Sequence, residues 1–186
     1  MKRIWVDRDK CLGCRTCELR CAVERDSVSK TLLGAVREEH RPAARVMVSG
    51  RTGEAFPIQC RHCEDAVCIR VCPAGAMQRN PETGTVFVDR SRCRGCWMCV
   101  MACPFGAVQP AAEFKTALKC DACADMEEPA CAASCPTGAL VYGDEESFAE
   151  ILAARRGQLA IYARTAPLPA GSSIVSIEAL RKGDGE

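Results

Sequence analysis

Near the middle of the chain, four cysteines follow one another closely in the stretch Cys93-Arg94-Gly95-Cys96-Trp97-Met98-Cys99-Val100-Met101-Ala102-Cys103-Pro104. The same C-x2-C-x2-C-x3-C spacing occurs near the N-terminus, at Cys11, Cys14, Cys17 and Cys21. Two looser quartets are C-x2-C-x4-C-x3-C at Cys60, Cys63, Cys68 and Cys72, and C-x2-C-x7-C-x3-C at Cys120, Cys123, Cys131 and Cys135. The four quartets use all 16 cysteines of the 186-residue chain.

Three uses of cysteine compete to explain these quartets: disulfides, zinc and iron–sulfur clusters. Disulfide-dense proteins are usually small and exported, and the N-terminal residues here do not form the apolar core of an export signal. Structural zinc sites usually join two C-x2-C pairs separated by a dozen or more residues. Three closely spaced thiolates and a fourth before a proline are instead typical of bacterial ferredoxins. The spacing predicts [4Fe–4S] clusters, with a zinc-rich structural or regulatory binding module as the alternative.

The cysteine motifs lie inside a longer internal repeat. Residues 4–17 align without a gap on residues 86–99, so a short strand, an Asp-Arg turn and a C-x-G-C loop are used twice. The last three quartets each end in Cys-Pro, and a glycine follows two residues after each proline, at Gly75, Gly106 and Gly138. Glycine at this place indicates a backbone turn with positive φ, or a close approach to the bound group.

The regular elements predicted from the sequence are short. Strands are expected at 3–7, 45–49, 85–89 and 139–142, with a hairpin-type turn at 80–84. A helix is expected over 30–39, with an apolar stripe of Leu32, Leu33 and Val36, and another over 148–156, with a capping box of Ser147 and Glu150 and an end at Gly157. Both helices are expected to cover the core. Residues 158–163 and 173–177 are interpreted as a strand-like arm that docks on a partner or covers the protein's own surface.

Composition excludes several classes of function. The chain has 25 basic and 24 acidic residues, so it lacks the positive excess that favours nucleic-acid binding. No stretch approaches the roughly 18 uninterrupted apolar residues of a membrane span. No phosphate loop, dinucleotide motif, metalloprotease motif or nucleophile elbow is present, which predicts a non-catalytic protein. Aromatic residues make up only 5%, so cluster ligation is expected to supply much of the folding free energy.

Over residues 3–150, with all four motifs in order, the sequence resembles the four-cluster polyferredoxin subunits of multi-subunit redox enzymes. Residues 60–65, 95–106 and 119–121 are most similar to two groups: the iron–sulfur protein that accompanies carbon monoxide dehydrogenase, and the small subunit of tungsten aldehyde oxidoreductase complexes. The resemblance implies an α+β fold of two bacterial-ferredoxin-like modules, each with two clusters. Residues 1–55 with 115–150 would form one module, residues 56–114 the other, and residues 151–186 a helix and a docking tail.

The resemblance also implies how the cysteines are shared among four [4Fe–4S] clusters, because the fourth cysteine of each motif serves the neighbouring cluster in two-cluster ferredoxins. The four ligand sets are each named by one member. They are the Cys11 set (Cys11, Cys14, Cys17 and Cys135), the Cys60 set (Cys60, Cys63, Cys68 and Cys103), the Cys93 set (Cys93, Cys96, Cys99 and Cys72) and the Cys120 set (Cys120, Cys123, Cys131 and Cys21).

The expected function is relay of single electrons through four clusters. The partners would be a large catalytic redox subunit, of carbon monoxide dehydrogenase, tungsten aldehyde oxidoreductase or hydrogenase type, and a second carrier or reductase subunit. A hetero-oligomer in the cytoplasm is expected, with association with a membrane complex left open. Four oxidised clusters would change the formal charge from +1 to about −7. The basic residues beside the motifs would either offset this charge or be solvated surface: Arg15, Arg61, Arg94 and Lys119.

Overall fold

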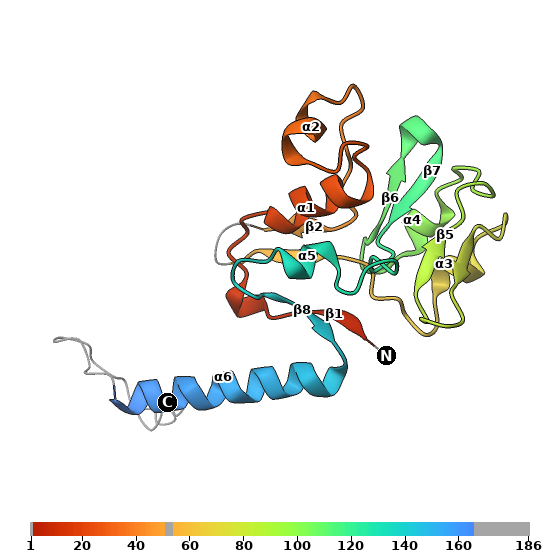
Figure 1. Cartoon of the computed structure of the whole chain (residues 1–186). Helices are drawn as coiled ribbons and strands as arrows, with labels where there is room; N and C mark the ends of the chain where they lie inside the picture. The colour runs from red at the N-terminus through yellow and green to blue at the C-terminus, as the bar shows by residue number, and fades with distance from the viewer. Residues whose placement is uncertain (1, 51–53, 166–186) are drawn as a thin grey trace, which may run out of the picture. The chain divides into compact units, whose positions relative to one another are not determined.

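The computed structural model describes residues 2–50 and 54–165, and the side chains of these residues up to position 158 (Figure 1). Residues up to Ala149 form one compact unit, and a second unit begins at Glu150. The helices are α1 (Thr16–Arg25), α2 (Leu32–Arg37), α3 (Val67–Arg70), α4 (Met98–Ala102), α5 (Ala130–Ala133) and α6 (Glu145–Thr165), with 3-10 turns at Arg8–Lys10 and Ala112–Phe114. The strands are β1 (Arg3–Val6), β2 (Met47–Ser49), β3 (Phe56–Ile58), β4 (Met77–Arg79), β5 (Val86–Val88), β6 (Val108–Ala111), β7 (Thr116–Lys119) and β8 (Leu140–Gly143).

The strands of the described residues form four two-stranded antiparallel sheets. Three of them are hairpins between neighbours in the sequence: β2–β3, β4–β5 and β6–β7. The fourth joins β1 to β8, with Arg3 opposite Gly143. The Trp5 indole donates to the Gly143 carbonyl at 3.0 Å and stacks on Phe148, with 5.4 Å between the ring centroids. The N-terminal strand is thereby held beside the end of the fourth cysteine motif.

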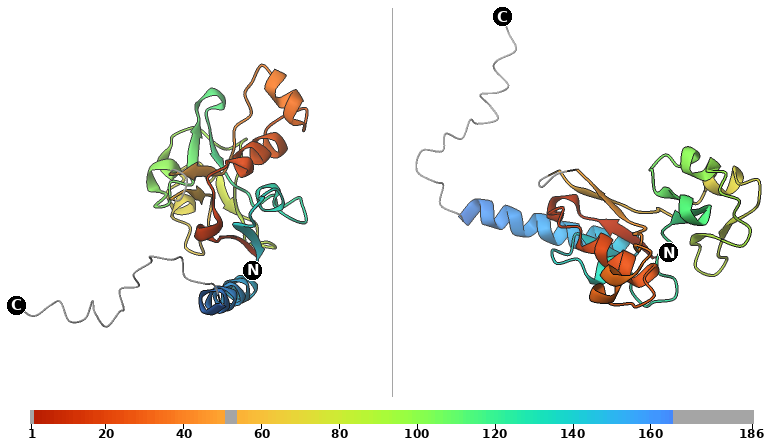
Figure 2. Two further views of the ribbon diagram at one scale, coloured as in Figure 1. Left: turned by 90° about the vertical axis from the view of Figure 1, so that its left-hand side faces the viewer. Right: turned by 90° about the horizontal axis from the view of Figure 1, so that it is seen from above.

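Buried apolar side chains form two separate cores within the compact unit. The first consists of Cys17, Cys21, Val46, Val48, Ala55, Cys131, Ala132 and Leu140. The second consists of Met77, Cys99, Val108 and Ala117, with further cysteines packed against it. Figures 1 and 2 show α1, α5 and the β1–β8 pair together on one side, while α3, α4 and the hairpins β4–β5 and β6–β7 gather on the other. Cysteines replace the large apolar residues that the composition lacks.

The α+β prediction is confirmed, and so are the four predicted strands, which match β1, β2, β5 and β8. The turn at 80–84 also forms. The Asn80 side chain accepts hydrogen bonds from the amides of Glu82 and Thr83, and its backbone carbonyl accepts one from Gly84. Strands β3, β4, β6 and β7 were not predicted. Two of them contain a proline, Pro57 in β3 and Pro110 in β6, and proline weakens the sequence signal for a strand.

The predicted module boundaries after residues 55 and 114 each fall inside a hairpin. Strand β3 pairs with β2, with Phe56 opposite Ser49. Strand β7 pairs with β6, and Ala117 lies in the second core. The division into two modules stays a prediction, and the hairpins favour boundaries at the ends of β3 and β7 for it.

Helix α2 is shorter than predicted, and its apolar stripe does not cover the core. The side chains of Leu33 and Val36 are each 78% exposed, and Leu32 is also exposed. Polar contacts hold this segment instead. Thr31 caps the helix by accepting the Gly34 amide, and the Glu38 carboxylate accepts from the Ser27 hydroxyl at 2.6 Å. The apolar pattern predicted the helix correctly and its packing wrongly.

Helix α6 differs from the prediction at both ends. It begins at Glu145 rather than 148, because Asp144 is the capping residue and accepts from both the amide and the hydroxyl of Ser147 at 2.8 Å. It does not end at Gly157 but continues to Thr165, so residues 158–163 are helical and not a strand-like arm. A single glycine among good helix formers costs about 1 kcal/mol, which does not end a helix. The predicted strand at 173–177 lies outside the described residues.

His40 connects the loop after α2 to the turn between β6 and β7. Its ring lies 3.2 Å from an Asp26 oxygen and 3.0 Å from a Glu113 oxygen, and its edge contacts Phe114. The hydrogen bond to Asp26, aided by Glu113, raises the pKa of His40. We expect ring-proton NMR titration to give a pKa above the ordinary 6.5, and Glu113→Gln to lower it.

The sign of this effect fixes the pH range of the contact. Because the folded-state pKa of His40 is raised, its contribution to stability is complete below about pH 6.5 and is lost as the pH rises through the folded-state value. Arg20→Gln is a suitable control, because Arg20 pairs with Glu24 on the exposed face of α1. A His40 pKa at or below 6.5 in the native protein would contradict the bridge.

Candidate iron–sulfur sites

Three cavities in the described structure are each lined by four cysteines. The sulfurs around the first come from Cys72, Cys93, Cys96 and Cys99, those around the second from Cys60, Cys63, Cys68 and Cys103, and those around the third from Cys11, Cys14, Cys17 and Cys135. Their volumes are about 20, 30 and 20 Å³, so the cavities are alike in size. The structure thus brings together the same cysteines that the resemblance places in the Cys93, Cys60 and Cys11 sets.

The remaining four cysteines also meet, at the contact between α1 and α5. All of them are buried: Cys21, Cys120, Cys123 and Cys131. Burial raises the pKa of the Cys131 thiol, and the neighbouring sulfurs of Cys120, Cys21 and Cys123 raise it further. Within the described part of the chain, no group of three or more Cys, His, Asp or Glu side chains is arranged around a single metal ion.

Each C-x2-C loop has its third residue in the left-handed region. These residues are Gly13, His62, Gly95 and Ala122, with φ between 47° and 68°. The turn aims backbone amides at sulfur: His62 donates to the Cys60 sulfur and Ala122 to the Cys120 sulfur, both at 3.3 Å. Three further backbone amides also donate to sulfur: that of Arg45 to Cys21, that of Ala76 to Cys72 and that of Ala117 to Cys93. Such hydrogen bonds tune the reduction potential of a ligated cluster.

The internal repeat is reproduced in the backbone. Arg15 and Trp97 occupy equivalent places, and both have left-handed φ values, 60° and 62°, immediately before α1 and α4. The glycines after the Cys-Pro pairs behave as predicted, because Gly75, Gly106 and Gly138 have φ of 60°, 60° and 62°. Each of them donates its amide to the carbonyl of the preceding cysteine at 3.2 Å. The same turn therefore follows the fourth cysteine of three motifs.

The thiols differ in how they respond to burial. Burial raises the pKa of Cys17 and of Cys99 to about 11, and that of Cys120 to about 12. Burial acts in the same direction on Cys72, but the amides of Met77, Ala76 and their neighbours outweigh it and lower the pKa. Iron ligation requires the thiolate form, so binding of a cluster must displace protons from the buried thiols.

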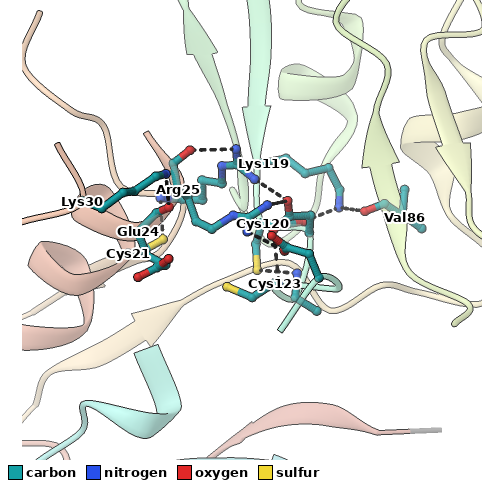
Figure 3. Close-up of polar contacts among 12 residues, drawn as sticks. Cys21, Glu24, Arg25, Lys30, Val86, Lys119, Cys120 and Cys123 are labelled. Carbon is teal, nitrogen blue, oxygen red and sulfur yellow. Dashed lines mark hydrogen bonds and ion pairs between the residues drawn. The ribbon is translucent and has the colours of Figure 1, made fainter. Parts of the chain in front are cut away.

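A half-buried ion-pair network supports the Cys120 loop. The Asp121 carboxylate pairs with Arg25 at 2.7 Å and with Arg45 at 2.5 Å, and Arg25 also reaches Asp125 (Figure 3). Burial opposes ionisation of Asp121, but Arg45 and Arg25 more than compensate and lower its pKa. This network ties α1, the loop before β2 and the fourth motif together. Sequence reasoning missed it, because no local pattern pairs residues so far apart in the chain.

The basic residues beside the motifs divide into two kinds. Arg15, Arg61 and Arg94 are exposed but each lines the cavity of a cysteine set, whereas Lys119 is buried. His62 is not needed as a ligand and packs in the interior. Its Nδ1 accepts the Val86 amide at 2.9 Å. Burial, with Lys119 as the next cause, lowers its pKa to about 3, so the ring is neutral. Trp97 lines the cavity of the Cys93 set.

Comparisons with known proteins agree with this geometry. The family model described as a 4Fe-4S dicluster domain matches residues 52–145, half of the chain. The chain is 37% identical over 174 residues to the electron transport protein HydN of Escherichia coli (strain K12), covering 85% of this chain and 97% of HydN. The chain belongs to the 4Fe-4S dicluster domain family.

Two electron-transfer or reductase proteins also have similar sequences. The probable anaerobic dimethyl sulfoxide reductase chain YnfG of Escherichia coli (strain K12) is 37% identical over 173 residues, which cover 89% of this chain and 80% of YnfG. The thiosulfate reductase electron transfer subunit PhsB of Salmonella typhi is 34% identical over 142 residues, which cover 74% of this chain and 72% of PhsB. The family match and these similarities confirm the prediction of a non-catalytic iron–sulfur electron-transfer protein and favour it over the zinc alternative.

Gly95 provides a test of the cavity of the Cys93 set. A Cβ added to Gly95 would lie 2.6 Å from the Lys115 carbonyl oxygen, in a backbone with φ of +64°. We expect Gly95→Ala to displace the loop that carries Cys93 and Cys96, and iron analysis to show a loss of about four irons per molecule. Gly75→Ala is the matched control, because Gly75 has φ of +60° but no atom within 4 Å of the added Cβ. Equal iron content in the two variants would contradict the close approach.

Proposed function

We propose that the chain holds four [4Fe–4S] clusters in two modules and relays single electrons between a catalytic oxidoreductase subunit and a second carrier. The observation that carries the proposal is the grouping of all 16 cysteines into four sets of four, three of them around cavities of similar size. Four thiolates for each cluster would leave no iron open to a substrate. This arrangement suits electron transfer and not bond-making catalysis.

The two separate cores support the division into two modules. The first core contains cysteines of the Cys11 and Cys120 sets, and the second is packed against cysteines of the Cys60 and Cys93 sets. With boundaries at the ends of β3 and β7, residues 1–58 with 120–149 would form one module, and residues 59–119 the other. In each module, the fourth cysteine of one motif joins the other motif's set, as in two-cluster ferredoxins.

The electrostatic neighbours of the cysteines support a linear order of clusters. In the first module, the Cys11 set adjoins the Cys120 set, because Cys17 is among the neighbours that raise the pKa of Cys131. In the second module, the Cys93 and Cys60 sets draw their cysteines from the same two motifs. Between the modules, Cys60 is among the neighbours that raise the pKa of Cys120. The proposed order is therefore Cys11 set, Cys120 set, Cys60 set, Cys93 set.

The partners follow from the relatives. PhsB is named as the electron transfer subunit of a thiosulfate reductase, and YnfG as a chain of a dimethyl sulfoxide reductase. We propose a comparable catalytic partner here, in a hetero-oligomer. Within residues 2–50 and 54–165, no helix is long and apolar enough to cross a membrane. The cytoplasmic location stays a prediction.

The relay is tested on the anaerobically prepared chain. We expect about sixteen irons and sixteen acid-labile sulfides per molecule, a broad absorption near 400 nm that dithionite bleaches, and four one-electron steps in an EPR-monitored redox titration. Affinity purification from the native source, followed by identification of the co-purifying large subunit, tests the partner. A colourless protein that contains zinc, or one with only two reducible clusters, would contradict the proposal.

The exchange of the fourth cysteine has its own test. We expect Cys72→Ser to alter the same EPR signal that Cys96→Ser alters, because both residues belong to the Cys93 set. Cys63→Ser, in the same motif as Cys72, should alter a different signal, because it belongs to the Cys60 set. A match between Cys72→Ser and Cys63→Ser would mean that each motif binds its own cluster, contrary to the proposed pairing.

A further inference from the structure

Lys119 is a buried lysine at the end of β7, immediately before Cys120. It is 4% exposed, and its ammonium group donates to the carbonyl oxygens of Val86 and of Cys120, the latter at 2.8 Å. Figure 3 shows the Lys119 side chain extending between the Cys120 loop and Val86 of β5. Among the described residues, no carboxylate lies within ion-pair distance of it, and Asp121, two residues later, pairs with Arg25 and Arg45. The ammonium is thus held in the interior by neutral carbonyl groups.

A second polar group completes this buried arrangement. The Val86 peptide accepts from Lys119 at its carbonyl and donates its amide to His62 Nδ1 at 2.9 Å. The imidazole is 4% exposed, and its Nε2 atom is buried with no hydrogen-bond partner. Because Nδ1 accepts the Val86 amide, it carries no proton, so the imidazole adds no second positive charge. Lys119, Val86 and His62 together form what we call the junction. Lys119 is its cation, and Val86 and His62 fix the surroundings of the ammonium group.

The junction lies between cysteines of two different sets. Lys119 directly precedes Cys120, of the Cys120 set, and its ammonium group contacts Val86, which lines the cavity of the Cys60 set. Cys60 is close enough to Cys120 to raise the pKa of its thiol. These two sets stand on either side of the proposed module boundary, so an electron that crosses between the modules must pass this place. The exposed Arg15 and Arg94 lie beside the outer sets, where water screens their charge.

We propose that Lys119 raises the reduction potentials of the clusters held by the Cys60 and Cys120 sets, and so lets electrons pass between the modules. This inference rests on the proposed function. Reduction adds one negative charge to a cluster, and a buried ammonium stabilises that added charge far more than an exposed one does, because the effective dielectric constant is lower in the interior. Lys119 acts on the potentials through space and ligates no iron.

The test is an EPR-monitored redox titration of three loaded variants. Lys119→Gln keeps a donor for the two carbonyls but removes the charge, Lys119→Arg keeps the charge, and Lys115→Gln removes an exposed lysine four residues earlier. We expect Lys119→Gln to disfavour reduction of one or both junction clusters by about tenfold, a shift of 59 mV to lower potential for a one-electron couple. In Lys119→Gln, the two outer clusters should keep their native potentials. In Lys119→Arg and in Lys115→Gln, all four clusters should stay near their native potentials.

Each other outcome contradicts the inference in a defined way. Native potentials in a fully loaded Lys119→Gln protein would show that the charge has no effect. Equal shifts in all four clusters would show a general disturbance. If neither Lys119→Gln nor Lys119→Met takes up the clusters, Lys119 serves assembly and the inference falls. A native chain with fewer than four reducible clusters would instead contradict the proposed function.

Discussion

The structure depends on one geometric constraint: four sulfurs must surround a space that a single tight turn cannot enclose. Each motif supplies three cysteines from one loop, and its fourth cysteine is carried away by a short helix that begins in the loop. In α1 and α4 that helix starts directly after a left-handed residue, Arg15 or Trp97. Cys21 and Cys103 then lie next to cysteines of another motif.

The second requirement is to place negatively charged clusters in a small protein. Amide donors to sulfur answer part of it, and they are available because the third residue of each C-x2-C loop has positive φ. A half-buried ion-pair group and a buried lysine offset another part of this charge. Asp121 balances two guanidinium groups, Arg25 and Arg45, beside the Cys120 set, and the Lys119 ammonium stands alone between two sets. The surface arginines beside the outer motifs contribute less, since solvent screens them.

The differences from the sequence-based expectations have a common physical cause. The stripe of Leu32, Leu33 and Val36 predicts a helix because periodicity is local, but burial depends on what lies opposite, and in the described structure these side chains remain exposed. Likewise, Gly157 is a weak helix breaker whose effect depends on its neighbours. The strands with a proline, β3 and β6, form because a hairpin partner is present.

The sequence alone determined the chemistry of this protein: the cysteine spacing, the repeat of residues 4–17 in 86–99 and the glycines after Cys-Pro indicate iron–sulfur clusters and the turns around them. These features are local, and covalent geometry limits what a short loop can bind. Only the tertiary structure decided which basic residue is buried, which carboxylate pairs with Arg25 and Arg45, and where the hairpins divide. Those outcomes depend on residues distant in the chain, whose proximity results from the packing of whole elements and is not encoded in any short segment.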